Sequence, residues 1–293
     1  MTQAIIDLAG TDDKVAREID VACRTHGYFY IVNYGIQSSF IEAIFNVSST
    51  FFALDREVKE SLNSHNSICG RGYFGIFQEK FDNINPDCKE GFDIGIDNKS
   101  DDPYVKAGTP FYGVNAWPED APEFKAALTE YFDQALALGR RILQLTSLAL
   151  GKNLNFFDGF MSKPMATLRI LRYPPDSSTA VGAGEHTDFG LLTLVLEKDT
   201  EGIEVKDRNG QWHLLPHFSS AILVNVGDIM EILSNGAYRA IPHRVINKSC
   251  RDRYSAVFFL DPDFYAKLPQ GIQSSDPVTA GGYILSKNQS ILG

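Results

Sequence analysis

The chain is poor in the features that define several protein classes. Its 293 residues include only four cysteines, scattered along the sequence as Cys23, Cys69, Cys88 and Cys250. Cysteines at such spacing fit neither a zinc motif nor a disulfide framework, so we expect free thiols in a reducing cytoplasm. No apolar run approaches the ~18 residues of a membrane-spanning helix. The first residues lack the basic and apolar segments of a secretion signal, and we expect none.

Positive charge is also scarce. Lysine and arginine number 27 against 37 aspartates and glutamates, which gives a formal net charge of −10, and the basic residues form no block. Because nucleic acids and acidic membranes select basic surfaces, we expect neither as a partner. We expect instead a small-molecule substrate and a monomeric protein. The chain also lacks internal repeats and low-complexity tracts.

What is present predicts a globular protein braced by one long helix. Hydrophobic residues make up 44% of the chain, enough for a sizeable core. Over residues 118–150 apolar side chains recur at steps of three and four, and Gly151 suits a left-handed helix end. A helix of this length, ~45 Å, can support a whole domain. The periodic positions are Phe124, Leu128, Tyr131, Phe132, Ala135, Leu138, Ile142 and Leu145.

Shorter elements are expected on both sides of this helix. Before it, the sequence predicts strands over 4–8 and 28–32, helices capped near Asp12 and Ser38, and mostly loops over 61–113. After it, short β-rich runs alternate with turns, at 166–173, 191–196, 203–205, 221–226, 244–246 and 254–260. Closely spaced short strands favour an antiparallel sandwich or barrel. The expected fold class is therefore mixed α/β (α+β).

Two histidines and an aspartate form the first candidate site. EHTDFG at 185–190 places His186 and Asp188 two residues apart before the apolar run LLTLVL, and PHRVI at 242–246 places His243 before another β-rich run. Two residues apart on a strand means the same face, as chelation requires. Two imidazoles and one carboxylate on one face of an octahedron favour non-haem Fe(II). Zinc is the alternative metal. The alternative to a metal site is a surface histidine held by hydrogen bonds, which is the more common role of the histidine in an H-x-D triplet taken alone.

A second pair of residues follows this triad. RDRYSAVFFL at 251–260 puts Arg253 and Ser255 on the same face of a predicted strand. A guanidinium and a hydroxyl together make a clamp for a carboxylate. A metal site beside such a clamp indicates a small acid that chelates the metal at one end and is anchored at the other.

Together these motifs resemble the iron(II)- and 2-oxoglutarate-dependent oxygenases of the isopenicillin N synthase-like family. Four further segments resemble that family across nearly the whole chain: RGYFGI at 71–76, KEGFDIG at 89–95, LRYPP at 171–175 and NVGDIMEILSNGAYRAIPHRV at 225–245. The resemblance implies a double-stranded β-helix, or jelly roll, with the long helix packed outside. We accordingly divide the chain into an N-terminal region (1–117), a supporting helix (118–151) and a jelly-roll catalytic region (152–293) that form one compact unit.

The resemblance also implies chemistry and residue roles. It places Fe(II) on His186, Asp188 and His243, and it places the distal carboxylate of 2-oxoglutarate on Arg253, Ser255 and Tyr173. The implied reaction uses O2, converts 2-oxoglutarate to succinate and CO2, and oxidises an unactivated C–H bond of a small polar metabolite, with hydroxylation expected first. Two alternatives remain open. One is an Fe(II) oxidase or cyclase of the same family that acts on an amino acid or peptide without 2-oxoglutarate, and the other is a non-catalytic binding module.

The walls of the substrate site follow from strand alternation. If Tyr173 faces the cavity, Leu171 and Arg169 face it too. An unpaired cation inside a barrel is costly, so Arg169 either binds a carbonyl or carboxylate of the substrate or pairs internally with Asp93 or Asp97. The remaining candidates for the substrate wall are Phe189, Phe92, Asp93 and Phe259. These side chains suit a compact polar heterocycle or an amino-acid-like substrate.

Overall fold

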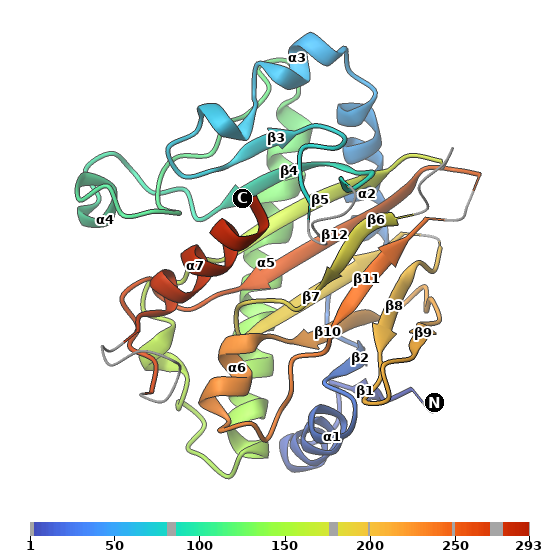
Figure 1. Ribbon diagram of the computed structural model, residues 1–293, viewed down its shortest axis with the longest axis vertical. Helices are drawn as coiled ribbons and strands as arrows, with labels where there is room; N and C mark the ends of the chain where they lie inside the picture. Colours follow the sequence, from blue (N-terminus) through green and yellow to red (C-terminus); the bar gives the residue numbers. More distant parts are fainter. Residues whose placement is uncertain are drawn as a thin grey trace.

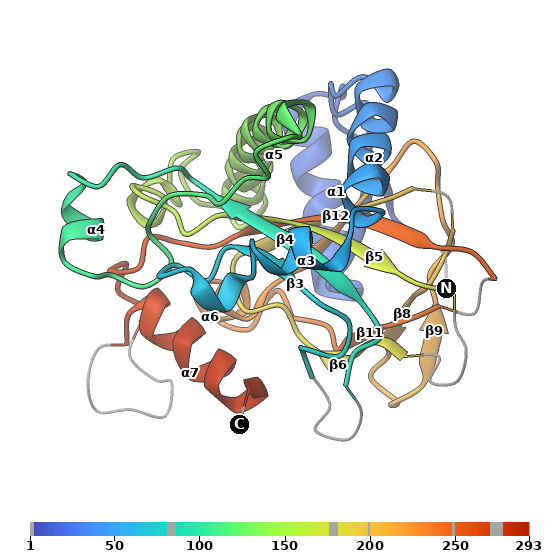
Figure 2. The same ribbon diagram turned by 90° about the horizontal axis from the view of Figure 1, so that it is seen from above.

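The protein is built from two facing β-sheets with helices against the outer face of the larger one. The computed structural model describes residues 3–80, 86–175, 181–198, 200–247, 250–269 and 278–292. Figure 1 shows the two sheets with the long helix crossing behind them, and Figure 2 shows helices α1, α2 and α5 stacked on the side of the large sheet that faces away from the small one. This layering gives the jelly-roll core of a mixed α/β protein.

The large sheet draws strands from both halves of the chain. Its order is β1 (Ile5–Asp7), β2 (Tyr28–Val32), β10 (Ile222–Val226), β7 (Leu192–Glu197), β12 (Arg253–Leu260), β5 (Thr167–Tyr173), β4 (Glu90–Gly95) and β3 (Gly72–Phe74). The small sheet has the order β6 (Val181–His186), β11 (His243–Ile246), β8 (Ile203–Lys206) and β9 (Trp212–Leu214). All neighbouring strands are antiparallel except β1 and β2. Because the N-terminal strands complete the large sheet, one compact unit is favoured, and the three-part division of the chain remains a prediction.

The helices lie mostly outside the sheets. They are α1 (Asp12–Thr25), α2 (Ser38–Phe52), α3 (Arg56–Glu60), α4 (Pro103–Lys106), α5 (Pro122–Ala149), α6 (Asp228–Leu233) and α7 (Ala280–Leu292), with short 3-10 turns η1 (Ser64–Asn66) and η2 (Asp158–Phe160). The long helix begins four residues later than predicted, at a proline whose fixed φ suits the first helical turn. It ends before Gly151, whose φ of +67° confirms the left-handed stop. In the described part of the chain, no helix combines the length and apolar composition that a membrane span needs.

The main core fills the space between these helices and the large sheet. The ring centroids of Phe51 and Phe124 lie 4.5 Å apart in a stacked pair, and those of Phe51 and Phe92 lie 4.9 Å apart edge to face. Leu128 and Ile142 of α5 are completely buried there, as their periodicity predicted. A second apolar cluster lies between the two sheets and includes Tyr173 and Leu171. The polar side chains of the candidate site lie at one end of this second cluster.

The prediction of mostly loops over 61–113 was wrong for β3 and β4. Every residue of β4, EGFDIG, is buried, although glutamate, glycine and aspartate are poor strand formers. A Cβ on Gly91 would lie 2.3 Å from the ring of Phe74, so only glycine allows this close packing. The charge of Glu90 is compensated by Lys59 at 2.9 Å and by Arg172 at 2.5 Å. Tertiary contacts therefore stabilise a strand that local propensity does not indicate.

The helix starts were also displaced by one residue. Thr11 and Gln37, rather than the predicted acidic and serine residues, occupy the cap positions of α1 and α2, and neither side chain makes a capping hydrogen bond. The helices are instead held by apolar faces, since Ile19 and Ile44 are wholly buried.

Candidate active site

The three predicted metal ligands meet at one end of the small sheet. His186 is the last residue of β6 and His243 is the first of β11, and the two are direct partners in the antiparallel ladder. One ligand atom from each of His186, Asp188 and His243 lies within 4.8 Å of the other two. Nε2 of His243 is 3.8 Å from Oδ1 of Asp188, and the two imidazole centroids are 4.3 Å apart. Strand pairing thus brings together residues 57 positions apart in the sequence.

Asp188 reaches the site by a different route from the one expected. It does not share a strand with His186 but lies in the connection between β6 and β7. Its backbone carbonyl accepts a 2.8 Å hydrogen bond from the amide of Asp228, and its Oδ2 accepts one of 3.3 Å from Asn225 Nδ2. The tight connection into β7, not strand alternation, therefore orients this carboxylate.

The histidines are held in the form that binds a metal. Nδ1 of His186 lies 2.8 Å from the carbonyl oxygen of Gly184, and Nδ1 of His243 lies 3.1 Å from that of Ile241. A carbonyl only accepts, so Nδ1 carries the proton in each ring and Nε2 keeps its lone pair. Burial, reinforced by the neighbouring His243, lowers the pKa of His186 to about 3 and keeps that ring neutral. A neutral imidazole is the metal-binding form.

The predicted carboxylate clamp is assembled on two adjacent strands. Arg253 and Ser255 lie on β12, and Tyr173 lies opposite Arg253 on β5. The guanidinium carbon of Arg253 is 4.7 Å from the centre of the Tyr173 ring. All three residues are at most 2% exposed.

The Arg253 guanidinium has unused hydrogen-bonding capacity. Its Nη2 donates to Glu197 of β7, but Nε and Nη1 are buried without a hydrogen-bond partner in the part of the chain that the structure describes. Buried donors without hydrogen-bond partners are costly, which indicates that a bound ligand accepts hydrogen bonds from these two nitrogens. A dicarboxylate whose far end reaches Arg253 and Ser255 fits this site.

A cavity of about 400 Å³ opens onto the metal-binding side chains. It is lined by charged or polar residues, among them Glu79, Asp93, Arg169, His186, Asp188, Asp261 and Asn288, and by apolar ones, among them Phe74, Phe111, Met165, Phe189, Phe259 and Ile284. Four predicted substrate-wall residues, Arg169, Phe189, Asp93 and Phe259, are in this lining. Its volume suits a small molecule.

Two other predicted wall residues are not in the lining. Phe92 lies on the opposite face of β4 from Asp93, is completely buried, and packs in the main core 5.2 Å from Phe124 between ring centroids. The prediction for Phe92 was wrong because neighbouring residues on a strand face opposite ways. Leu171 shares the face of Tyr173 but lies in the closed apolar cluster between the sheets, beyond the cavity.

Arg169 is held by acidic residues of the protein itself. Its Nε and Nη2 each donate to a different oxygen of Asp93 at 2.8 Å, and its Nη1 donates to Glu79 at 3.1 Å. The internal ion pair with Asp93 is therefore present, whereas Glu79 gave no signal in the sequence. Lys89 bridges Glu79, at 3.1 Å, to Asp87, at 2.7 Å.

This network reaches back to the metal-binding strand. Asp87 Oδ1 accepts a 3.0 Å hydrogen bond from the amide of Gly184, whose carbonyl in turn orients His186. The Arg169 guanidinium also lies over the rings of Phe74 and Phe259, at 4.7 and 6.0 Å from their centres. The cavity wall and the metal ligands are thus parts of one connected structure.

Arg169→Leu should lower the free energy of unfolding by about 3 kcal/mol, because it leaves the buried carboxylate of Asp93 without its partner and removes one of the two cations paired with Glu79. Equilibrium denaturation measures the loss. The double variant Arg169→Leu/Asp93→Leu should recover part of it, since it also removes the unpaired charge of Asp93. A single variant as stable as the wild type would contradict an ion pair of this strength.

Asp261 is a cavity residue that the sequence analysis missed. It directly follows β12, two residues after Phe259, and it is partly buried in the cavity wall. Burial, and secondarily the negative charge of Asp188, raise the pKa of Asp261 to about 7. If the predicted strand had extended one residue beyond Leu260, strand alternation would have placed Asp261 on the same face as Phe259.

Gly190 makes room for this carboxylate. A Cβ at residue 190 would lie 1.7 Å from Oδ1 of Asp261. Gly190→Ala should therefore lower stability by about 1–3 kcal/mol, the usual cost of overpacking. Thermal unfolding of the single variant and of Gly190→Ala/Asp261→Ala checks this. The double variant should be the more stable, and equal stabilities would show that the contact does not matter.

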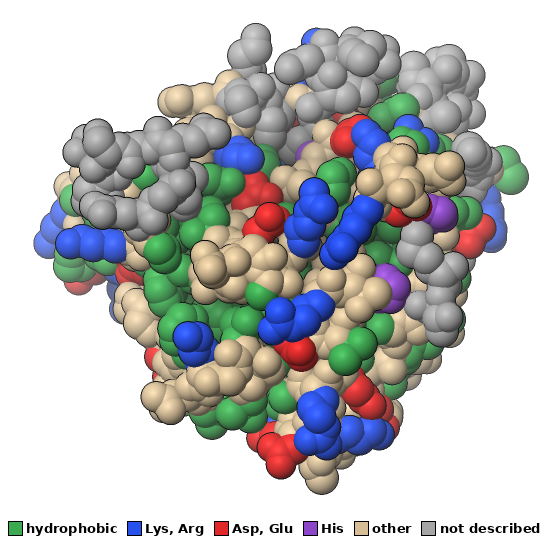
Figure 3. Space-filling model, turned by 60° about the horizontal axis from the view of Figure 1, so that its bottom comes forward, with side chains coloured by type: hydrophobic (Ala, Val, Ile, Leu, Met, Phe, Trp, Pro, Cys, Tyr) green, Lys and Arg blue, Asp and Glu red, His purple; other side chains and the backbone are tan. Residues whose placement is uncertain are grey.

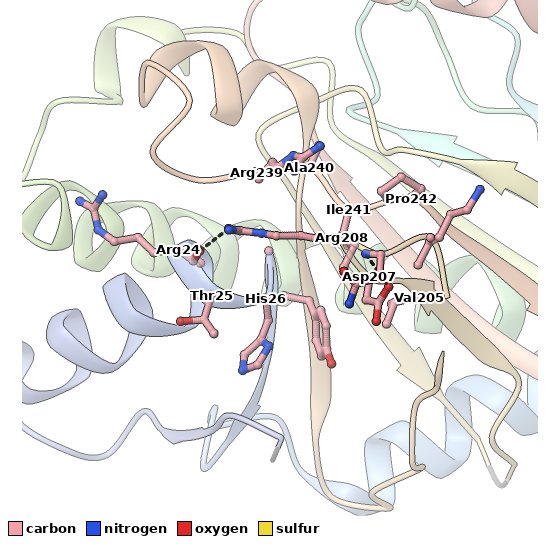
Figure 4. Close-up of a pocket in the computed structure, with 16 residues that line it drawn as sticks. Arg24, Thr25, His26, Val205, Asp207, Arg208, Arg239, Ala240, Ile241 and Pro242 are labelled. Carbon is pink, nitrogen blue, oxygen red and sulfur yellow. Dashed lines mark hydrogen bonds between the residues drawn. The ribbon is translucent and has the colours of Figure 1, made fainter. Parts of the chain in front are cut away.

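A second cavity, of about 370 Å³, lies away from these residues (Figure 4). It is lined by the end of α1, the β8–β9 turn and the segment before β11, and it contains none of the predicted site residues. Arg208 Nη2 donates to the carbonyl of Arg24 at 3.2 Å across it. Figure 3 shows Lys and Arg side chains gathered near the middle of the underside, which no run in the sequence indicates. Because the two cavities are similar in size, the metal-binding group decides which one is the active site.

The comparisons with known proteins agree with this choice. Residues 164–262 match the family model described as the 2OG-Fe(II) oxygenase superfamily, and residues 4–120 match the one described as non-haem dioxygenase in morphine synthesis N-terminal. The 2-oxoglutarate-dependent dioxygenase citB of Monascus ruber is 37% identical, over 85% of this chain and 78% of its own length. Homoarginine-6-hydroxylase 2-ODD-C23.1 of Arabidopsis thaliana is 34% identical, over 86% of this chain and 78% of its own.

A solved structure extends the likeness to three dimensions. A full-length Neurospora crassa protein in complex with alpha-KG (2-oxoglutarate) and thymine superposes with a TM-score of 0.83 at 28% identity. The match covers 98% of this chain and 96% of that chain.

Proposed function

We propose a role for each residue of the site and a class of substrate. The premise is that the chain belongs to the 2OG-Fe(II) oxygenase superfamily. The protein is a 2-oxoglutarate-dependent dioxygenase that uses Fe(II), 2-oxoglutarate and O2 and oxidises its substrate with release of succinate and CO2. The observation that carries the assignment of residues is the cluster of His186, Asp188 and His243, of which His186 and Asp188 line the cavity of about 400 Å³.

The metal and the cosubstrate are assigned to two adjoining groups of side chains. The two neutral imidazoles of His186 and His243 and the carboxylate of Asp188 would hold Fe(II). Arg253, Ser255 and Tyr173 hold the distal carboxylate of 2-oxoglutarate. When bound, the metal and cosubstrate supply the oxidising power for C–H hydroxylation through oxidative decarboxylation of 2-oxoglutarate.

The protein contributes orientation and protection to this chemistry. Gly184 and Ile241 fix the protonated Nδ1 atoms of the two histidines, so that both Nε2 atoms face the metal position. Phe189 and Phe259 line the cavity beside Asp188 and exclude water from the reacting C–H bond. Arg169 and Asp93 form its polar wall, and the remaining donor capacity of Arg169 serves a carbonyl or carboxylate of the substrate.

The substrate proposed for this cavity is a small polar metabolite. The names of similar proteins agree: homoarginine for the Arabidopsis hydroxylase, and thymine bound to the Neurospora protein. The unused donors of Arg253 call for a carboxylate partner, and the similarity to 2-oxoglutarate-dependent dioxygenases favours 2-oxoglutarate over a substrate carboxylate in that place. We further propose that the enzyme acts as a monomer in the cytoplasm, where its cysteines stay reduced.

A panel of polar metabolites, scored by succinate release with Fe(II) and 2-oxoglutarate, tests this function. A substrate should raise succinate release above the uncoupled background and gain one oxygen atom, detected by mass spectrometry. Product formation that proceeds without 2-oxoglutarate would instead assign the oxidase reaction.

A further inference from the structure

The charged groups of the active-site cavity differ in how well the protein itself compensates them. Arg169 is paired with Asp93 and Glu79, and Glu79 is also paired with Lys89. Within the part of the chain that the structure describes, the Arg71 side chain donates hydrogen bonds to uncharged acceptors: the carbonyls of Ile96, Gly113 and Phe111 and Oδ1 of Asn115, at 2.7–3.2 Å. The carboxylate of Asp188 is assigned to the metal.

Asp261 is the exception among these groups. No hydrogen bond or ion pair connects its carboxylate to any residue that the structure describes, and its electrostatic neighbour is another carboxylate, Asp188. A partly buried carboxylate without a donor is unfavourable as an anion, so it either takes up a proton or pairs with a cation supplied from outside the protein. Gly190 is packed against this carboxylate and leaves it room without offering a cation.

The surroundings of Asp261 indicate which kind of ligand group could pair with its carboxylate. Phe259, two residues earlier, also lines the cavity and presents an aromatic ring. The guanidinium of Arg169 already lies 6.0 Å from the centre of the Phe259 ring, so an organic cation in this cavity gains mainly from the unpaired carboxylate of Asp261 and packs its apolar part against the ring. The cavity volume of about 400 Å³ limits that cation to a small molecule.

We propose that Asp261 is the specificity-determining residue of the substrate site and that it binds a positively charged nitrogen group of the substrate, a guanidinium or a protonated amine. This inference rests on the proposed function, because it assumes that the cavity beside the metal ligands receives the substrate. It adds a substrate charge and a recognition residue to that function.

Three probes of similar length and different charge test the proposal: butylguanidine, butylurea and pentanoate. Their dissociation constants for the full-length protein with Fe(II) and 2-oxoglutarate, kept anaerobic, are measured by calorimetry or by ligand-detected NMR. Butylguanidine should bind about tenfold more tightly than butylurea, since a charge-assisted hydrogen bond in a cavity is worth that much. Pentanoate can bind the remaining donors of Arg169, so its affinity is compared between proteins: it should rise in Asp261→Asn, because Asp261 repels it.

Variants separate the role of Asp261 from the charge of the whole protein. Asp261→Asn should weaken butylguanidine about tenfold and leave butylurea unchanged, because an amide oxygen still accepts a hydrogen bond. Asp133→Asn removes the same charge from an exposed position on α5 and should change neither. Equal affinity for guanidine and urea, or an Asp261→Asn variant that still prefers guanidine, would overturn the proposal.

The visible absorption of the Fe(II)–2-oxoglutarate complex distinguishes failure of the two proposals. If the wild type and Asp261→Asn both form the complex but butylguanidine has no advantage, the inference about Asp261 fails alone. If the wild type forms no such complex, the proposed function fails, and the inference fails with it. A complex in both proteins with the expected loss of guanidine affinity supports both.

Discussion

Asp188→Ala should abolish turnover and weaken Fe(II) binding by at least about 100-fold, the upper end of what substitutions outside the ligand set cost. Asp188 is the single anion of the three-residue group, so its loss leaves two neutral imidazoles to hold a dication. The fold should survive, because among the described residues the Asp188 side chain accepts a single hydrogen bond, of 3.3 Å, from Asn225. Metal content after equilibrium dialysis and the rate of succinate release measure the two effects.

The control for this prediction is Asp133→Ala on the exposed face of α5, which changes the net charge equally and touches no ligand. It should bind Fe(II) and turn over as the wild type does. If Asp188→Ala kept its iron and its activity, the metal would have to lie elsewhere in the molecule.

Arg253→Met should raise the KM for 2-oxoglutarate by about 100-fold, because removing one partner of a buried, hydrogen-bonded charge pair costs 2–5 kcal/mol or more. The same substitution strands the buried carboxylate of Glu197, so the free energy of unfolding should also fall, by about 3 kcal/mol. Loss of affinity and loss of stability are therefore mixed in the single variant.

The double variant Arg253→Met/Glu197→Met separates these effects. With both charges gone the stability should return to near the wild-type value, whereas the KM for 2-oxoglutarate should stay high because the clamp is still missing. Denaturation curves and cosubstrate titrations of the three proteins give the comparison. A double variant with a wild-type KM would show that Arg253 does not hold the cosubstrate.

The sequence was most informative where a short spacing and a strand period coincide. The triad and the Arg253–Ser255 pair were predicted by number, and the structure places each set of side chains together. Six of the eight strands described after residue 160 were predicted to within one residue at each end, and β6 and β9 were missed; the β-branched and aromatic side chains of the six pack on buried faces of the sheets. The long helix was predicted by its apolar period, although not its start at Pro122.

The sequence was least informative where a partner distant in the chain decides the conformation. β4 and β6, EGFDIG and VGAGEH, have little strand propensity and were not predicted as strands. Phe92 was assigned to the cavity because its register was unknown. Pairing of Asp93 with Arg169 across β4 and β5 places the aspartate toward the cavity and the phenylalanine toward the helices.

Cavity residues from irregular segments were also beyond reach. Glu79 lies outside any strand, and its ion pairs with Arg169 and Lys89 join residues that no sequence pattern connects. Ile284 and Asn288 reach the cavity from α7, which is held by the bonds of Tyr283 and Lys287 to Asp228, at 2.9 and 3.0 Å. Such contacts follow from the packing of the whole chain, not from local propensity.

Anaerobic titration of the metal-free protein with Fe(II) and 2-oxoglutarate, followed by visible absorption, tests the central claim most directly. The account predicts a charge-transfer band that saturates at one Fe(II) per chain, needs 2-oxoglutarate, and is absent from Asp188→Ala. A wild-type protein without this band, or an Asp188→Ala variant that shows it at full strength, would contradict the assignment of His186, Asp188 and His243 as the iron site.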